Sequence, residues 1–312
     1  MELVRGLHNL SQRHRGSVLT VGNYDGVHLG HQQMIGVLKA RAAELRSVAT
    51  VLVFEPSSKE FIDPDGAPPR LTRWREKYLA LAALGVERLV TLRFDECMRA
   101  MTPRCFVDEL IVEGLGTRHM VVGHDFRYGS NAGGTIESLQ AAGHAHGFGV
   151  EEVAPFVFDG VRVSSTAVRE RLERADFPAA ACLLGRPYRM SGRVVYGRQL
   201  GRTLGFPTAN LRLMRRKPPL WGILAVWVYG IGSGPLPGVA SLGTRPTVDG
   251  IEPLLEAHVF DYSGDLYGHA IEVEFVAKLR DEVKFDSLDA MLVQMKIDAA
   301  SARDLLSKVG CG

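Results

Sequence analysis

A glycine-rich segment with two histidines, residues 22–31, is the first place in the sequence that can do chemistry. Its glycines let the backbone approach a ligand, and the helix predicted after it offers unpaired N–H groups that suit a phosphate. His28 and His31 are three residues apart, so both imidazoles can share one face of the first turn. They can donate hydrogen bonds to phosphate oxygens whose charge grows during attack on phosphorus. A metal-binding histidine pair is the weaker alternative, because no cysteine or carboxylate cluster completes a site.

The segment at residues 121–129 combines polar, basic and aromatic side chains after a short apolar strand pattern. Open α/β sheets bind ligands at the carboxyl edge of their strands. Asp125, Phe126 and Tyr128 fall at that edge, which makes them candidates for the same site. The alternative is an ordinary exit from a strand, with Phe126 and Tyr128 packed in the core.

A third segment, residues 163–169, places three hydroxyl groups at the expected start of a helix. Ser164, Ser165 and Thr166 can hold phosphate oxygens, with Arg169 one turn further along. A simple serine N-cap is the alternative, and it is favoured when the segment is taken alone. Together with the glycine–histidine segment upstream, phosphate binding by residues 163–169 is favoured over a simple N-cap.

The stretch from residue 192 to residue 210 is dense in glycine and arginine. It contains no G-x-x-x-x-G-K-[ST] pattern and is therefore not a P-loop. It can form a flap whose backbone and guanidinium groups bind phosphates. Thr208 and Asn210 offer neutral oxygens, a ligand type that Mg²⁺ accepts together with water and substrate phosphates. A glycine-rich β-turn with buried polar caps is the alternative.

Glu256 lies in an alternating run, residues 255–259, that predicts a strand. A carboxylate on one face of a strand can accept the proton of a hydroxyl nucleophile. A solvent-facing glutamate is the alternative, and spacing alone does not select Glu256 over Glu252 or Glu272.

The elements that must position these groups alternate between strand and helix in the first half of the chain. This alternation predicts a doubly wound parallel α/β domain. Its expected strands lie at residues 17–21, 48–54, 88–94, 120–122 and 150–153.

From about residue 188 the chain is rich in glycine, proline and short apolar runs, which predict an antiparallel barrel or sandwich. A helical pattern after Ser287 follows. The change of character near residues 185–187 predicts two domains, 1–185 and 186–312. The expected strands of the second are residues 223–229, 239–242, 257–260 and 271–276.

Composition excludes several classes of protein. The 312 residues are 46% hydrophobic and 23% charged, which is typical of a soluble protein of about two domains. A net charge of +2 argues against general nucleic-acid binding. The longest wholly apolar run, residues 223–229, is far shorter than the ~20 residues that span a membrane. With no secretory segment visible, Cys97, Cys105, Cys182 and Cys311 are expected to be free thiols in the cytoplasm.

An ordered series of motifs makes the chain resemble the bifunctional bacterial riboflavin kinase/FMN adenylyltransferases, also called FAD synthetases. The resemblance covers roughly residues 15–308, and it is specific because the motifs occur together. They are GNYDGVHLGH (22–31), VGHDFRYG (122–129), VSSTAVR (163–169), GRTLGFPTAN (201–210), SLGTRPT (241–247), EAHV (256–259) and DLYG (265–268).

The resemblance implies two reactions that use ATP and Mg²⁺. The first module, a nucleotidyltransferase-like Rossmann domain, would convert FMN and ATP to FAD and pyrophosphate. The second, a six-stranded antiparallel barrel with a C-terminal helix, would convert riboflavin and ATP to FMN and ADP. Small molecules are the only partners implied, with no nucleic acid and no membrane, and the protein would be a monomer or a weak homo-oligomer.

The resemblance also implies roles for individual residues. His28 and His31 would stabilise the adenylyl-transfer transition state, and Glu256 would be the base that activates the ribityl hydroxyl. Thr208 and Asn210 would contact Mg·ATP, while Ser164, Ser165, Thr166 and Arg169 would hold the β- and γ-phosphates. Further nucleotide contacts are implied at Gly22, Asn23, Tyr24, Asp25, Gly30, Gly192, Gly197 and Arg202, and flavin contacts at Asp125, Phe126, Tyr128 and Arg280.

The chain departs from the family pattern at Ser57 and Ser58, where the family usually has a further proline after Glu55-Pro56. That loop is expected near the flavin and ATP of the first module. Two rival functions are another H-x-G-H nucleotidyltransferase with a different acceptor, and a flavin-binding module without activity. The kinase-like second half argues against the first rival, and the full set of expected catalytic residues argues against the second.

Overall fold

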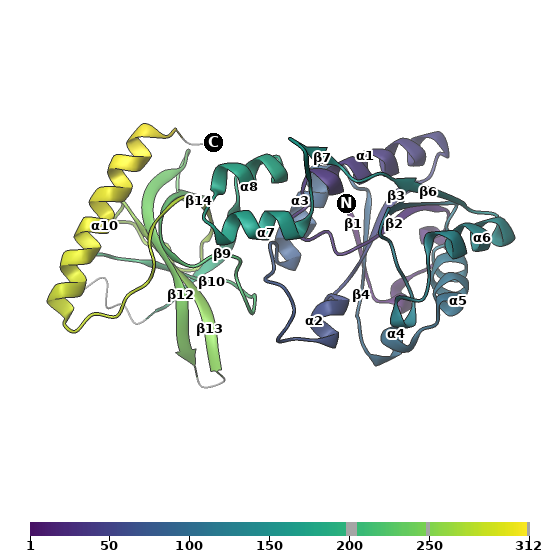
Figure 1. Ribbon diagram of the computed structural model, residues 1–312, viewed down its shortest axis with the longest axis horizontal. Coiled ribbons are helices and arrows are strands. Elements are labelled where there is room, and N and C mark those ends of the chain that lie inside the picture. The colour runs from purple at the N-terminus through teal and green to yellow at the C-terminus, as the bar shows by residue number, and fades with distance from the viewer. Residues whose placement is uncertain (198–204, 248–249, 311–312) are drawn as a thin grey trace. The chain divides into compact units, whose positions relative to one another are not determined.

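The computed structural model describes residues 1–197, 205–247 and 250–310, which form two compact units (Figure 1). The first unit comprises Met1–Pro68 and Trp74–Ser164, and the second comprises Pro69–Arg73 and the chain from Ser165 onward. The division comes earlier than the change of character near residue 185. Its cause is helix packing, because α7 (Ser165–Glu173) contacts α8 (Phe177–Leu184), and α8 contacts strand β14 (Ala270–Arg280).

The first unit is built on a parallel sheet of six strands, in the order β1-β4-β3-β2-β5-β6. This confirms the prediction of a doubly wound parallel α/β domain. The edge strand β1 was not expected, because its four residues carry too short a pattern to stand out. The strands are β1 (Glu2–Arg5), β2 (Ser17–Val21), β3 (Val48–Phe54), β4 (Arg88–Leu92), β5 (His119–Gly123) and β6 (Gly149–Val153).

Two hydrophobic clusters cover the two faces of this sheet, because successive strand residues point to opposite sides. Val18 and Val51 belong to one cluster, and their neighbours Leu19 and Leu52 belong to the other. The helices α1 (Leu29–Glu44) and α3 (Trp74–Ala83) pack on the first face, and η3 (Phe106–Gly114) and α6 (Ile136–His146) pack on the second. The shorter elements of this unit are η1 (Leu7–Asn9), η2 (Gln12–His14), α2 (Ser58–Ile62), α4 (Glu96–Ala100), α5 (Pro103–Cys105), η4 (Ser130–Ala132), β7 (Val157–Phe158) and β8 (Val161–Arg162).

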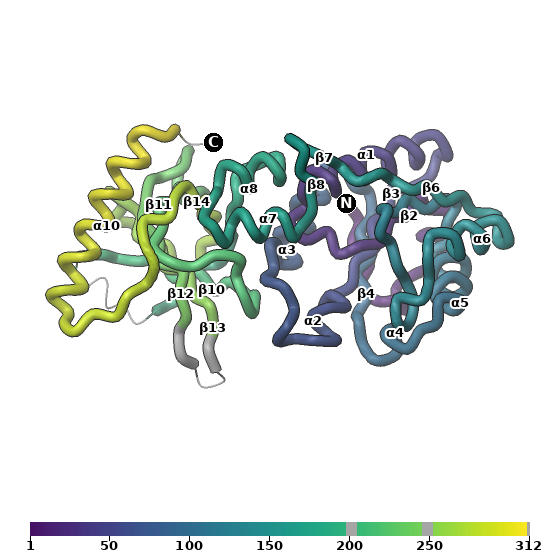
Figure 2. The backbone as a smooth tube through the Cα atoms, in the orientation of Figure 1, coloured from purple at the N-terminus to yellow at the C-terminus, as the bar shows by residue number. Residues whose placement is uncertain are grey.

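The second unit is a closed antiparallel barrel in the order β10-β13-β12-β11-β14-β9. Its C-terminal helix α10 (Leu288–Lys308) begins at the N-cap Ser287 and packs along the barrel, as Figure 2 shows. This confirms the barrel with a C-terminal helix. The remaining strands are β9 (Arg189–Val195), β10 (Ala209–Arg212), β11 (Gly222–Tyr229), β12 (Leu236–Thr247) and β13 (Gly250–Val259).

Two general expectations can be compared with the described part of the chain. None of its helices has both the length and the apolar character needed to cross a membrane. Cys97, Cys105 and Cys182 are free thiols, and Cys311 lies outside the described residues.

Candidate active sites

The strand order of the first unit reverses between β2 and β5, the arrangement that in open α/β sheets leaves a crevice at the carboxyl ends of the strands. From β2 the sheet continues through β3 and β4 on one side, whereas from β5 it continues to β6 on the other. Ligands of open α/β sheets bind at such a switch point, outside the carboxyl ends of the strands. The loop of residues 22–28 follows β2 and the segment of residues 124–129 follows β5. The fold therefore brings these two predicted segments to one crevice.

The loop after β2 has an unusual backbone. Tyr24, Gly26 and Val27 all have positive φ angles, of 48°, 85° and 45°. This region is costly for a β-branched residue such as valine, so the surrounding structure must hold it in place. The side chains of Tyr24 and Val27, each 1% exposed, anchor the loop in the core. The Tyr24 hydroxyl also forms a 2.7 Å hydrogen bond with Oγ1 of Thr20, and the Tyr24 ring lies 4.8 Å from the ring of His31, centroid to centroid.

The two histidines lie together at the start of α1. His28 is the N-cap, and its Nδ1 accepts a 3.4 Å hydrogen bond from the backbone N–H of His31. The two rings stack with centroids 3.7 Å apart. Gly30 between them leaves little room, because a Cβ there would lie 3.3 Å from the His28 ring and 3.4 Å from the carbonyl oxygen of Val163. The pair is thus fixed at a helix N-terminus, where unpaired N–H groups favour an anion.

His31 is held in its neutral form. Its Nδ1 is enclosed and has no hydrogen-bond partner among the described residues. Burial, followed by the charges of His28 and Lys77, lowers the pKa of His31 well below its usual range. A neutral imidazole has one N–H donor and one acceptor nitrogen. At pH 7 His31 can therefore donate a hydrogen bond but carries no positive charge.

The remaining residues of the crevice differ in exposure. Asn23 is exposed, while Gly22 and Asp25 are half-buried. Asp125 forms a 2.9 Å ion pair with Arg162 of β8. Tyr128 is 6% exposed, packs in the core with half-buried Phe126 beside it, and its hydroxyl lies 3.0 Å from Oγ of Ser138. The alternative interpretation, that these aromatic rings belong to the core, thus describes Tyr128 well.

The predicted phosphate contacts after residue 163 lie on both sides of the division between the units. Ser164 ends the first unit, whereas Ser165, Thr166 and Arg169 are in α7 of the second. The Nε of Arg169 donates a 2.6 Å hydrogen bond to the carbonyl oxygen of Pro69, within the second unit. That these residues act together with the two histidines stays a prediction.

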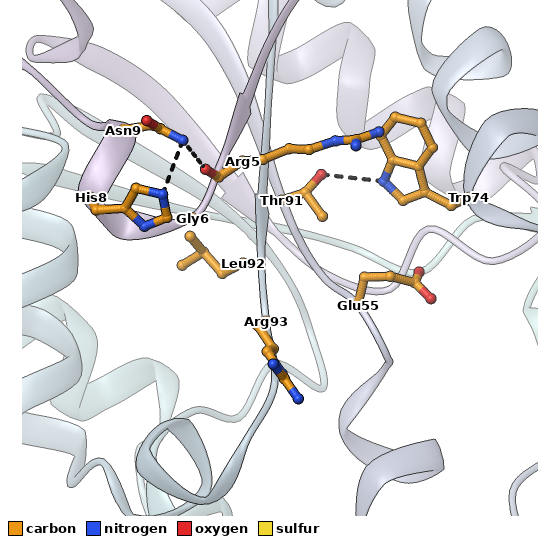
Figure 3. A pocket seen from close by; sticks show the side chains of 9 residues that line it. All are labelled: Arg5, Gly6, His8, Asn9, Glu55, Trp74, Thr91, Leu92 and Arg93. Carbon is orange, nitrogen blue, oxygen red and sulfur yellow. Dashed lines mark hydrogen bonds between the residues drawn. The ribbon is translucent and has the colours of Figure 1, made fainter.

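A cavity of about 570 Å³ opens at the carboxyl ends of β1 and β4 (Figure 3). Sequence reasoning missed it, because β1 was not predicted and none of the predicted site residues lines it. The Arg5 guanidinium lies over the Trp74 ring, 4.4 Å from its centroid, and Nε1 of Trp74 donates to Oγ1 of Thr91 at 3.3 Å. The full lining is Arg5, Gly6, His8, Asn9, Glu55, Trp74, Thr91, Leu92 and Arg93.

In the barrel, the strand register places Glu256 between two other candidate groups. It is paired with Asn210 of β10 on one side and with Ser241 of β12 on the other. Directly opposed residues of antiparallel strands have Cβ atoms about 4.5–5.5 Å apart and point to the same face. Leu255 and Ala257, which flank Glu256, are fully buried, so Glu256 points away from the barrel interior.

The strand register also distinguishes Glu256 from Glu252 and Glu272, the two other glutamates that spacing allows as the base. Glu252 is exposed and lies 3.6 Å from Arg212, and Glu272 lies 3.8 Å from Arg189. Neither of them is paired with Asn210. Of the three glutamates, only Glu256 is directly paired with a predicted Mg·ATP contact, Asn210 on the neighbouring strand.

Asn210 has the features of a metal or phosphate contact. It is 6% exposed, and its Oδ1 is enclosed without a hydrogen-bond partner in the described part of the chain. Its Nδ2 donates to the carbonyl oxygen of Thr208 at 3.3 Å. Gly197 is predicted to contact nucleotide and adjoins this amide, since a Cβ at Gly197 would lie 2.6–2.8 Å from the Asn210 amide. A neutral, unpartnered oxygen beside Thr208 fits the oxygen ligands that Mg²⁺ accepts.

Three other predicted contacts of the second module have different surroundings. Gly192 faces the barrel interior, where a Cβ would lie 3.0 Å from Cβ of Leu211, so core packing accounts for this glycine. Arg280 is engaged by Asp298 of α10, with its Nε 3.0 Å from Oδ1 and its Nη2 2.7 Å from Oδ2. This pair ties α10 to β14. Arg202 lies outside the described residues.

Comparison with known proteins covers both modules. The family model for FAD synthetase matches residues 10–167, and the model for riboflavin kinase matches residues 184–306. The protein from Pseudomonas fluorescens is 47% identical over 98% of both chains, and that from Escherichia coli K12 is 46% identical over 97% of both. Both are named bifunctional riboflavin kinase/FMN adenylyltransferase.

A solved structure has the same fold over nearly the whole chain. It is a crystal structure described as a macrolide-efflux protein from Streptococcus pneumoniae, 30% identical, with a TM-score of 0.79. The match covers 97% of this chain and 99% of that one. Together, the two module matches and the full-length relatives show that this chain belongs to the bifunctional riboflavin kinase/FMN adenylyltransferase family, whose members make FMN from riboflavin and FAD from FMN with ATP.

Proposed function

We propose that the first unit makes FAD at the crevice between β2 and β5, with His28 and His31 at the reacting phosphate. A phosphate oxygen of FMN attacks the α-phosphorus of ATP and forms the new P–O–P bond. The bond from the α-phosphorus to the oxygen bridging it to the β-phosphate breaks, and its electron pair leaves with pyrophosphate. Negative charge grows on the α-phosphate oxygens during this step, and the imidazole N–H groups and the start of α1 are placed to stabilise it.

The attacking group needs no base in this reaction. A phosphate monoester carries a charge of about −1.5 to −2 at pH 7, so FMN arrives with an ionised oxygen. The site therefore needs hydrogen-bond donors rather than an acceptor of protons. The observation that carries the proposal is the stacked histidine pair at the N-terminus of α1, 3.7 Å apart.

The second unit, in this proposal, makes FMN beside Glu256. The primary hydroxyl of the ribityl chain attacks the γ-phosphorus of ATP, Glu256 accepts the hydroxyl proton, and ADP leaves. Thr208 and Asn210 would hold Mg²⁺, which supplies positive charge to the phosphates when it is bound. The observation that carries this part is the register, which pairs Glu256 with Asn210, whose Oδ1 is unpartnered among the described residues.

Two variants, each impaired in a different module, test both assignments in one assay. Wild type, H31A and E256Q are incubated with ATP and Mg²⁺ and either riboflavin or FMN, and the flavins are resolved by chromatography. H31A should lose about 10²–10³-fold in FAD formation and keep FMN formation. E256Q should lose about 10²–10⁴-fold in FMN formation and keep FAD formation from supplied FMN. Equal loss of both activities in either variant would refute the assignment of one reaction to each site.

We further propose that the protein is cytoplasmic, that its substrates are riboflavin, FMN and ATP, and that it is a monomer or a weak homo-oligomer. A reducing compartment would keep Cys97, Cys105 and Cys182 as free thiols, the form in which they occur here. Light scattering over a range of protein concentrations tests the oligomeric state.

A further inference from the structure

Lys77 of α3 is the only buried lysine in the described part of the chain, with 5% of its surface exposed. It lies on the inward face of its helix, one turn before the fully buried Leu81. Trp74 and Tyr78, its neighbours on α3, pack against the apolar cluster of the first sheet face. Burial of an ammonium is costly, and lysine is rarely found at such positions. Helix packing alone would favour an apolar side chain here.

The topology of the sheet brings Lys77 to the edge where the histidines lie. α1 leads from β2 into β3, and α3, which comes after α2 and residues 69–73, leads into β4. Both helices pack on the same face of the sheet. Because β2, β3 and β4 are parallel neighbours, a helix that packs on this sheet and leads into β3 or β4 begins at the carboxyl edge. His31 is in the first turn of α1, and Lys77 is in the first turn of α3. The effect of Lys77 on the pKa of His31 agrees with this placement, because it requires the ammonium to lie within electrostatic reach of the imidazole.

The histidine segment of the adenylyl-transfer site has no cationic side chain of its own, and Arg169, the predicted contact to the β- and γ-phosphates, belongs to the second unit. Residues 22–31 contain no lysine or arginine, and Asp25 adds a negative charge. His31 is neutral, and Arg162 at the edge of the crevice is paired with Asp125. The reaction nevertheless gathers a triphosphate and a monophosphate at one place, and transfer of phosphoryl groups depends on neutralising that charge.

We propose that Lys77 is a further catalytic group of FAD formation, whose ammonium contacts the phosphates of ATP beside His31. It supplies positive charge to the α-phosphate oxygens as the FMN oxygen attacks and to the pyrophosphate as it leaves. The inference rests on the assignment of adenylyl transfer to His28 and His31. It gives the site a fixed cation on α3 that complements the two imidazole donors on α1.

The test uses the full-length protein with Lys77→Met, which keeps an unbranched apolar side chain, and Lys77→Arg, which keeps the charge. Lys39→Met is the matched control, because Lys39 is an exposed lysine of α1 whose Nζ donates to the carbonyl oxygen of Leu84. Rates of FAD formation are measured at a temperature at which circular dichroism shows every variant to be folded. FMN formation is measured in the same preparations, as is inhibition by added pyrophosphate.

Lys77→Met should lower kcat for FAD formation about 10²–10³-fold, the usual effect of removing one stabilising group. It should also weaken inhibition by pyrophosphate at least tenfold, an effect that a merely structural lysine would not have. Lys77→Arg should recover part of both losses, and Lys39→Met should match wild type. Wild-type kcat or wild-type pyrophosphate inhibition in folded Lys77→Met would overturn the proposal. His31→Ala, measured alongside, separates the two assignments: if it retains FAD formation, the histidine site itself is wrong.

Discussion

Nδ1 of His31 and Oδ1 of Asn210 are both enclosed without a hydrogen-bond partner among the described residues. An unsatisfied buried polar atom costs about 1–3 kcal/mol of stability, so each of these two atoms needs an explanation. Each belongs to a residue that the sequence motifs had placed in an active site, one in each unit. In the proposed sites, a substrate group or Mg²⁺ would be the partner of these atoms, and its binding would offset this cost.

The lowered pKa of His31 predicts how stability varies with pH. Below its usual pKa of about 6.5, histidine in the unfolded chain binds a proton that folded His31 does not. Stability of the first unit should therefore fall as pH falls below about 6.5, by up to about 1.4 kcal/mol per pH unit from this group. His31→Gln should remove that part of the slope. Urea unfolding of both proteins at pH 7.5 and pH 5.5 measures it, and identical slopes would contradict the prediction.

Asn210→Ala should separate activity from stability. Removing the amide takes away an oxygen for Mg·ATP, but it also removes an unsatisfied buried atom. We expect FMN formation to fall at least tenfold, while the free energy of unfolding changes by less than about 1 kcal/mol. FAD formation from supplied FMN should be unchanged. Kinetics and urea unfolding of the same variant give the answer, and parallel loss of stability and activity would indicate a structural role.

At the scale of elements, periodicity and apolar runs predicted the central strands well because burial is what those patterns encode. All five residues of β2 are buried, and three of them, Val18, Leu19 and Val21, are apolar. The strands β1, β7, β8 and β10 were missed, since two to four residues are too few to show a pattern. The seven-residue strand β9 was also missed, because arginine, serine and glycine interrupt its apolar residues. Spacing did not select Glu256 over the other two glutamates, because register between strands distant in the chain decides which side chains are neighbours; only the family resemblance pointed to Glu256.

Gly30 and Gly36 offer a matched pair of substitutions in one helix. A Cβ at Gly36 would meet nothing within 4 Å, whereas a Cβ at Gly30 would crowd the His28 ring. Gly36→Ala should stabilise the first unit by about 0.5–1 kcal/mol through helix propensity and leave FAD formation unchanged. Gly30→Ala gains the same propensity but should displace His28 and lower kcat for FAD formation about tenfold or more. Equal activity of the two variants would show that the histidine ring tolerates displacement.

On the scale of the whole molecule, the second unit is not one continuous stretch of chain. Pro69–Arg73 belongs to it, although both flanking segments belong to the first unit. Nη1 of Arg215 donates to the carbonyl oxygens of Arg70 and Leu71, each at 3.2 Å, and the Tyr188 hydroxyl donates to Leu71 at 2.9 Å. Arg215 is 6% exposed, so these carbonyl groups accept hydrogen bonds from a guanidinium that has little access to water.

Two fragments test the predicted boundary between the domains. A fragment of residues 186–312 lacks α8, whose Phe177 and Leu184 are buried and whose Phe177 ring stacks on Phe275, with centroids 6.2 Å apart. Each such side chain contributes about 1.5–3 kcal/mol when buried. Residues 165–312 should therefore melt at a higher temperature than residues 186–312 and form FMN more efficiently. Thermal melts and FMN assays compare them, and equal stability would support the boundary near residue 185.

Because residues 69–73 belong to the second unit, the two units must complete their folding in a fixed order during synthesis on the ribosome. Synthesis runs from the N-terminus, and domains generally fold as they emerge. Every residue of the first unit has been made by Ser164, before any strand of the barrel exists. The first unit can therefore acquire its fold while the nascent chain is still growing. The short passage at residues 69–73 must wait until Tyr188 and then Arg215 have been translated, so the barrel completes its structure around a segment made long before it.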